Sequence, residues 1–225
     1  MSAPVASPDP RHRLHHLFDT QRRAMLADPV PSLERRLDRI DRVRRLVVDG
    51  EARICTAMTN DFGSIHPAMV VMLDTLPVIE RVNHISTHLA DWMRPKDVDL
   101  GPAHGSSRGQ VLRAPKGVTG NIAPWNFPIE SALVMVVDML AAGNTCIVKP
   151  SELAPSTADV LESLVGEHFA PDELAVVQGG PDFSAQFASM PWDHLTFTGS
   201  ARVGRLVMAA AAANLVPVTL ELGGK

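Results

Sequence analysis

A carboxylate and a side-chain amide are the residues of this 225-residue chain best suited to chemistry, because each follows an apolar run typical of a buried strand. Glu221 lies in PVTLELGGK (217–225), and Asn126 lies in NIAPWNFPIE (121–130). A carboxylate at the end of a buried strand usually has a function, and an amide held between two prolines can donate to an oxyanion. On residue type alone, the alternative is that Asn126 bonds its own backbone in a turn.

The segment VKPSE (148–152) places a lysine and a glutamate three residues apart at the end of another apolar run. Lys149 and Glu152 could hydrogen-bond the hydroxyls of a ribose, or they could form a local salt bridge at the rim of a sheet. Pro150 cannot continue a strand ladder, and Ser156 is the expected N-cap of the following helix. Residue types alone leave both interpretations of the pair open.

A third strand-end segment, FTGSARVG (197–204), combines two glycines with the expected start of a helix near Ala201. Backbone N–H groups at a helix start attract phosphate, and a glycine allows a ligand to approach the backbone closely. Gly199 and Gly204 have the spacing G-x4-G, which differs from the GxGxxG of standard dinucleotide folds. An ordinary turn between a strand and a helix is therefore the alternative interpretation.

These candidates lie in the second half of the chain, where short apolar runs alternate with helical stretches. Continuously apolar strands are buried on both faces, which is typical of a parallel sheet. With right-handed crossovers, the pattern predicts an α/β fold with an open, doubly wound parallel sheet of about five strands, whose ligands bind at the carboxyl ends of the strands. The expected strands are residues 118–123, 145–149, 174–178, 194–198 and 217–222, and the expected helices are residues 130–143, 156–169, 182–190 and 201–215.

The first half of the chain is predicted to be helical, because its apolar residues recur at steps of three and four. One helix is expected to begin after Ser32 as its N-cap and to end at Gly50, with further helical segments around residues 54–58 and 70–92. The expected domains are a flexible tail over 1–13, a helical region with a Gly/Pro/Ser-rich connection (95–110) over 14–110, and a Rossmann-like nucleotide-binding region over 111–225.

Composition argues against several classes of partner. The net charge is −4, and the basic residues of the first half are mixed with acidic ones, so we expect no nucleic-acid binding. No apolar run approaches the length of roughly 20 residues that a membrane span needs, so we expect no membrane association. Two distant cysteines and no secretory signal favour the cytoplasm. His84 and His88 have helical ligand spacing but no third ligand, so we expect no metal site.

The motifs PWNFP, VKPSE, FTGSxxVG and LELGGK, in this order and spacing, closely resemble those of the NAD(P)-dependent aldehyde dehydrogenases. The resemblance is strongest over residues 115–225. The helical N-terminal third is similar to the class 3-type branch, and the runs LERRLDRIDRVRRLVVD and NHISTHLADWMRP look most like those of bacterial coniferyl aldehyde dehydrogenases.

This resemblance implies a role for each matching residue. In the family, a cysteine thiolate attacks the aldehyde, hydride passes to NAD or NADP, and water cleaves the resulting thioester. Asn126 matches the amide that stabilises the oxyanion, and Glu221 matches the base that activates water. The residues that match the cofactor-binding positions are Pro124, Trp125, Lys149, Glu152, Gly199, Ser200, Val203 and Gly204.

The nucleophile has no match, because the family places it after the LELGGK segment in a catalytic domain that we expect to be absent here. Cys55 and Cys146 lie in helical and strand contexts and are expected to be structural. We therefore expect an N-terminal fragment that is inactive alone. The full-length enzyme is expected to be a homodimer that oxidises an aromatic, coniferyl-type aldehyde to a carboxylic acid. The alternatives are a CoA-acylating aldehyde dehydrogenase, against which Glu221 argues, and a non-catalytic nucleotide-binding or interaction module.

Overall fold

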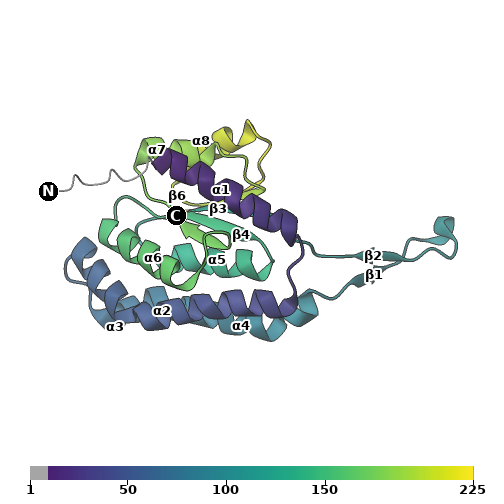
Figure 1. Ribbon diagram of the computed structural model, residues 1–225, viewed down its shortest axis with the longest axis horizontal. Helices are drawn as coiled ribbons and strands as arrows, with labels where there is room; N and C mark the ends of the chain where they lie inside the picture. The colour runs from purple at the N-terminus through teal and green to yellow at the C-terminus, as the bar shows by residue number, and fades with distance from the viewer. Residues whose placement is uncertain (1–9, 225) are drawn as a thin grey trace.

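The computed structural model describes residues 10–224, and a five-stranded parallel sheet forms its centre (Figure 1). The strand order is β5-β4-β3-β6-β7, and all four neighbouring pairs are parallel. The predicted α/β fold and its parallel sheet are confirmed. The strands are β3 (Val118–Ile122), β4 (Thr145–Lys149), β5 (Leu174–Val176), β6 (His194–Gly199) and β7 (Val218–Leu222).

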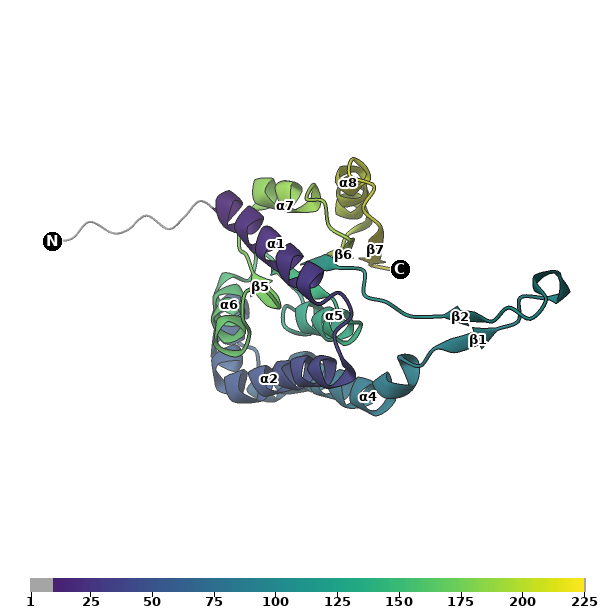
Figure 2. The same cartoon turned by 45° about the vertical axis from the view of Figure 1, so that its right-hand side comes forward.

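Helices cover both faces of this sheet (Figures 1 and 2). One face carries α5 and α6, with α2 and α4 forming a further layer outside them, while α1, α7 and α8 cover the other face. The chain runs outward from β3 to β5 and then returns to β6 on the other side of β3. A ligand crevice is expected at such a reversal, outside the carboxyl ends of the strands. The helices are α1 (Pro10–Ala27), α2 (Leu33–Phe62), α4 (Leu76–Trp92), α5 (Glu130–Ala141), α6 (Pro155–His168), α7 (Pro181–Ala188) and α8 (Ala201–Ala212).

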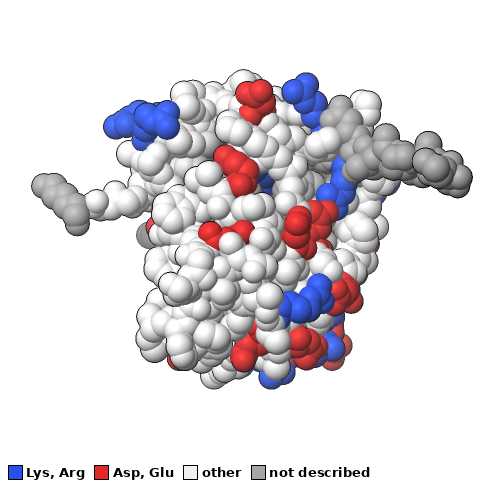
Figure 3. Space-filling view, turned by 90° about the vertical axis from the view of Figure 1, so that its left-hand side faces the viewer, with Lys and Arg blue, Asp and Glu red and all other residues white. Residues whose placement is uncertain are grey.

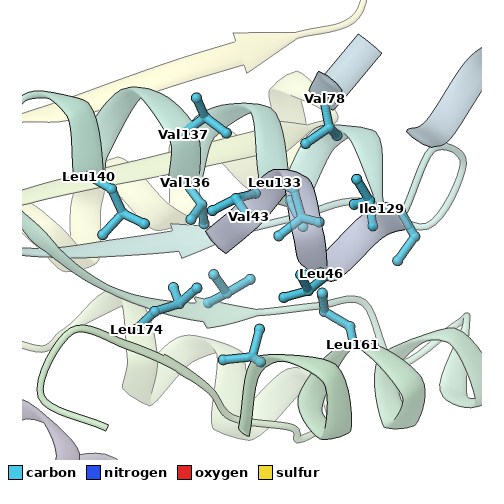
Figure 4. Packing of buried hydrophobic residues seen from close by; sticks show 14 of the residues in the cluster. Val43, Leu46, Val78, Ile129, Leu133, Val136, Val137, Leu140, Leu161 and Leu174 are labelled. Atoms are coloured by element: carbon cyan, nitrogen blue, oxygen red, sulfur yellow. The ribbon is translucent and has the colours of Figure 1, made fainter. Parts of the chain in front are cut away.

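The larger hydrophobic core joins the helical region to the sheet (Figure 4). Val43 and Leu46 of α2 lie against the apolar side of α5, where Leu133 and Val136 are fully buried. Leu161 of α6 belongs to the same cluster. Because the cluster is continuous from α2 to the sheet, the position of the helical region relative to the strand ends is set by close packing.

Helix α2 differs from the prediction at its C-terminal end. Ser32 is its N-cap, as expected, and its Oγ accepts a hydrogen bond from the Arg35 N–H at 3.2 Å. Gly50 does not end the helix, which continues to Phe62. A Cβ atom on Gly50 would collide with Leu164 of α6, which is fully buried. The glycine therefore lets α2 and α6 approach closely, and that role has no signal in the local sequence.

The segment between α2 and α4 is less regular than the single helix expected over 70–92. It contains α3 (Pro67–Val70) and a π-helical turn, η1 (Val71–Thr75), before α4 begins. No single helix among the described residues is long and apolar enough to cross a membrane; α2 and the 67–92 segment meet those criteria only as a pair bent by 106°. The buried apolar residues of this pair belong to the main core.

The predicted connection over 95–110 forms an antiparallel hairpin that projects from the body (Figures 1 and 2). Strands β1 (Lys96–Val98) and β2 (Gly109–Val111) flank a short 3-10 helix, η2 (Pro102–His104). Three-residue strands exposed on both faces carry no clear hydrophobic period, which explains why the sequence did not predict them. At the other end, residues 10–13 of the predicted tail belong to α1; the rest of the predicted tail lies outside the described residues.

One face of the molecule bears charged side chains of both signs, separated by larger uncharged areas (Figure 3).

Candidate functional site

A cleft of about 1280 Å³ lies at the carboxyl ends of β3, β4, β6 and β7. Its volume exceeds the range of about 300–1,000 Å³ typical of sites for drug-sized ligands, so the cleft has room for an extended ligand. The predicted site residues that line it are Pro124, Trp125, Asn126, Lys149, Glu152, Gly199, Ser200, Val203 and Glu221. Four separate sequence motifs thus meet at one place, as the parallel order of the strands requires.

The turn after β3 presents Asn126 to this cleft. Trp125 and Asn126 are exposed, and within the described part of the chain the Asn126 side chain has no hydrogen-bond partner. The alternative in which Asn126 bonds its own backbone is therefore not what the structure contains. The Trp125 ring stacks on Phe62 of α2, with ring centroids 6.4 Å apart. The Asn126 amide is free to donate to an atom in the cleft. The turn that carries it packs against the helical region through Trp125.

Lys149 and Glu152 bond each other at the end of β4. The Nζ atom of Lys149 donates to Oε2 of Glu152 at 2.7 Å. Burial pushes the pKa of Glu152 upward, but hydrogen bonds from Lys149 and from a backbone N–H, with the lysine charge, leave it below its usual range. The salt bridge exists, and the exposed carboxylate still faces the cleft, so the salt bridge and a ribose contact are compatible.

The helix after this turn does not begin as expected. Ser156 is not the N-cap of α6; its N–H instead donates to Oδ1 of Asp61 at 2.9 Å. The residue in the N-cap position is Ala154, whose side chain cannot accept a hydrogen bond. Asp61 belongs to α2 and lies 95 residues away in the chain. The predicted N-cap was therefore wrong, because the acceptor at the start of α6 comes from a distant helix and not from the local sequence.

The N-terminus of α8 forms another wall of the cleft. The helix begins at Ala201, as expected, and the Oγ atom of its N-cap Ser200 accepts a hydrogen bond from the Val203 N–H at 3.3 Å. Arg202 also lines the cleft, although sequence reasoning did not select it. A cation at a helix N-terminus next to free backbone N–H groups suits a phosphate group. The only signal for Arg202 was its place inside the FTGSxxVG motif.

Gly204 is the predicted cofactor residue that the structure does not bring to the cleft. A Cβ atom at this position would lie 2.9 Å from Cδ2 of Leu222 in β7. The glycine therefore allows α8 to pack closely on β7. Gly199 does line the cleft, and a Cβ atom there would lie 2.6 Å from Cζ of Phe197.

Glu221 lies near the end of β7, opposite Thr198 of β6 in the strand register. Its side chain is exposed, lines the cleft and has no bonding partner among the described residues. Gly223 and Gly224 follow it along the same wall. An unpaired carboxylate in a cleft that also holds an unpaired amide can accept a proton while the amide stabilises negative charge.

Neither cysteine lies in the cleft. Cys146 is completely buried in β4, and burial raises the pKa of its thiol to about 12, although a hydrogen bond with Thr119 acts in the opposite direction. Cys55 lies in α2, where burial and the charge of Glu51 raise the pKa of its thiol. A nucleophile has to be a thiolate, so both cysteines suit packing better than catalysis.

No group of three potential metal ligands occurs among residues 10–224. The rings of His84 and His88 are in tilted contact with centroids 4.5 Å apart, and His88 stacks on Trp92. This ladder of aromatic rings on one side of α4 accounts for the helical spacing of the two histidines.

Comparison with known proteins gives one consistent result. Residues 23–225 match the aldehyde dehydrogenase family. The chain is 39% identical to a probable coniferyl aldehyde dehydrogenase of Caulobacter vibrioides over 100% of its own length and 47% of that protein's, and 37% identical to a coniferyl aldehyde dehydrogenase of Pseudomonas sp. over 99% and 45%. The substrate-bound structure of Staphylococcus aureus AldH superposes with a TM-score of 0.90 at 29% identity, covering 94% of this chain and 46% of that one. The chain thus spans about half the length of these relatives.

Proposed function

The chain belongs to the aldehyde dehydrogenase family, and from this premise we propose that it provides the cofactor cleft, the oxyanion donor and the general base of an enzyme that oxidises an aldehyde to a carboxylic acid. The observation that carries the proposal is the meeting of Asn126, Glu221 and the Lys149–Glu152 pair in one cleft. Each is supplied by a different strand end, and each has the chemistry that its role requires.

The residues of the cleft fit a nicotinamide dinucleotide, which accepts hydride when bound. Glu152 offers a carboxylate to ribose hydroxyls while Lys149 holds that carboxylate in place. The start of α8, with Ser200 and Arg202, offers N–H groups and a positive charge to the pyrophosphate. Pro124 and Trp125 form the wall beside them. We assign the cofactor as NAD or NADP.

The chemistry of acyl transfer uses the two unpaired polar groups. The Asn126 amide donates to the oxygen that becomes negatively charged when a nucleophile adds to the aldehyde carbonyl. Glu221 accepts a proton from the water that releases the carboxylic acid. Because neither Cys55 nor Cys146 reaches the cleft, the described residues supply no thiolate for this addition.

We further infer that the substrate of the whole enzyme is an aromatic aldehyde of the coniferyl type. This inference rests on the two relatives with that activity in their names, which match the chain over nearly its whole length. We also propose that residues 1–225 by themselves bind the cofactor without oxidising aldehydes, because neither cysteine lies in the cleft.

Calorimetric titration of the purified chain with NAD+ and NADP+ tests the proposal. We expect saturable binding of at least one of them, abolished by Ser200→Trp, which fills the start of α8, and weakened by Glu152→Ala. A matched assay with coniferyl aldehyde should show no increase in absorbance from reduced cofactor. Absence of binding of both dinucleotides to the folded chain would contradict the cofactor assignment, and turnover by the chain would contradict its inactivity.

A further inference from the structure

Two helices that follow strands of the sheet lack an N-cap side chain of their own. Helix α5 has Ile129 in that position and α6 has Ala154, and neither side chain can accept a hydrogen bond from the first N–H groups of its helix. Helix α8, by contrast, is capped by its own Ser200. The first N–H groups of α5 and α6 therefore need acceptors from elsewhere in the chain.

Two aspartates of the helical N-terminal region supply these acceptors. Oδ1 of Asp74 accepts from the N–H groups of Ile129 and Glu130, each at 3.2 Å. Asp61 uses both carboxylate oxygens: Oδ1 accepts from the N–H of Ser156 at 2.9 Å, and Oδ2 accepts from the N–H and hydroxyl of Thr157, each at 2.7 Å. Each carboxylate holds the start of one helix from a different element.

Both caps lie directly after turns that carry residues of the cleft. The turn 123–129, which ends at the Asp74 cap, contains Trp125 and Asn126, and the turn 150–154, which precedes the Asp61 cap, contains Glu152. Phe62, the neighbour of Asp61, stacks on Trp125. The end of α2 and the turn η1 thus contact both of the turns that present polar groups to the cleft.

The burial and local backbone of Asp74 support a specific role. Asp74 is only 2% exposed and lies in a π-helical turn. Such turns are a widened form of helix that is often found at functional sites. A buried carboxylate is unfavourable unless it has hydrogen-bond donors, and Asp74 receives two from the turn that holds Asn126.

We propose that Asp61 and Asp74 are positioning residues of the cleft: Asp74 fixes the turn that presents Asn126, and Asp61 fixes the turn that presents Glu152. This inference builds on the proposed function, because the importance of the two turns comes from it. The helical N-terminal region then fixes the positions of the oxyanion donor Asn126 and of the ribose contact Glu152.

Nuclear magnetic resonance of the isotope-labelled chain 1–225 tests each aspartate separately. We expect Asp74→Ala to shift the side-chain amide resonances of Asn126 and to remove cross-peaks between the rings of Phe62 and Trp125. The resonances of Ser156 and Thr157 should stay in place. Asp61→Ala should shift the resonances of Ser156 and Thr157 and leave those of the Asn126 side chain in place. It should also weaken NAD+ binding roughly tenfold, equivalent to about 1.4 kcal/mol.

Conservative variants distinguish positioning from a general loss of stability. Asp74→Asn keeps the single acceptor oxygen that Asp74 uses, so it should restore the wild-type Asn126 resonances. Asp61→Asn keeps only one of two acceptors, so it should restore the Ser156 contact or the Thr157 contact but not both. Should Asp74→Ala not fold, Asp74→Ser, whose hydroxyl is too short to reach both N–H groups, carries the same readout.

The outcome that overturns the proposal is a folded Asp74→Ala variant with unchanged Asn126 resonances and unchanged ring cross-peaks. Unchanged NAD+ affinity in a folded Asp61→Ala variant would overturn the part that concerns Glu152. If the wild-type chain itself binds no NAD+, the proposed function fails, while the resonances of Asn126 still decide whether Asp74 holds the turn.

Discussion

The ammonium group of Lys149 lies 2.7 Å from a carboxylate oxygen of Glu152, and the two side chains differ sharply in exposure, at 2% for the lysine and 38% for the glutamate. The lysine is thus a buried cation whose charge is balanced by one partner at the edge of the cleft. Replacement of Glu152 by a neutral residue is destabilising, because the charge of Lys149 then stays buried without a partner. Glu152 consequently combines a structural role with its proposed contact to the cofactor.

Removal of the Glu152 charge should therefore destabilise the fold. We expect Glu152→Gln to lower the free energy of unfolding by about 1–2 kcal/mol, less than for a fully buried pair because water reaches the carboxylate. The double variant Lys149→Met/Glu152→Gln should recover much of this loss, since it also removes the buried charge. Urea unfolding of the wild type, both single variants and the double variant measures the coupling energy. Additive effects of the two single changes would show that the pair is not coupled.

Gly50 should resist substitution although it lies inside a helix, where alanine is normally better. A Cβ atom would collide with buried Leu164, so we expect Gly50→Ala to lower the free energy of unfolding by about 1–3 kcal/mol. The matched control is Gly166→Ala in α6, which has no atom within 4 Å of the new methyl group. That variant should be more stable than the wild type by about 0.5–1 kcal/mol. Equal effects of the two changes in thermal unfolding would contradict this account of Gly50.

Asp74 and Asp61 should give opposite pH dependences of stability. Burial raises the pKa of Asp74 to about 6 despite its hydrogen bonds, and the charge of Glu130 acts in the same direction. The folded chain therefore favours the protonated form of Asp74. The resulting stabilisation is complete below the pKa of about 3.9 in the unfolded chain and is lost as pH rises through about 6. For Asp61, burial is outweighed by the donors on Thr157 and Ser156, so its pKa is lowered, and its contribution is lost as pH falls below about 4.

Variants that do not titrate reveal these two contributions. Relative to the wild type, Asp74→Asn should become more stable as pH rises from about 4 to about 7. Asp61→Asn should become relatively less stable as pH rises from about 2.5 to about 5. Urea unfolding across this range measures both slopes. A flat difference for Asp74→Asn would show that the carboxyl group titrates normally in the folded chain.

The sequence predicted the sheet and most of the cleft because both depend on local patterns. Continuous apolar runs indicated buried parallel strands, and parallel strands bring their carboxyl ends to one edge, so Asn126, Glu152 and Glu221 had to meet. The aspartate caps were not predictable in this way. Ser156 is a good N-cap by type, but its N–H is bonded to Asp61, 95 residues away, and only the packing of α2 on α6 brings them together. The packing role of Gly50 was hidden for the same reason.

The fluorescence of Trp125 should report cofactor binding directly. The stacking of Trp125 on Phe62 provides a second test of the same signal. Trp125 is 50% exposed and lines the cleft, whereas Trp192 is buried in the core and Trp92 lies on α4 away from the cleft residues. A dinucleotide in the cleft should reduce the quenching of Trp125 fluorescence by acrylamide, and Trp125→Phe should abolish this change. Trp92→Phe is the matched control and should retain it. Phe62→Ala removes the stacking partner, so the ring should be more accessible to acrylamide before NAD+ is added. Protection that persists in Trp125→Phe would mean that the cofactor binds elsewhere.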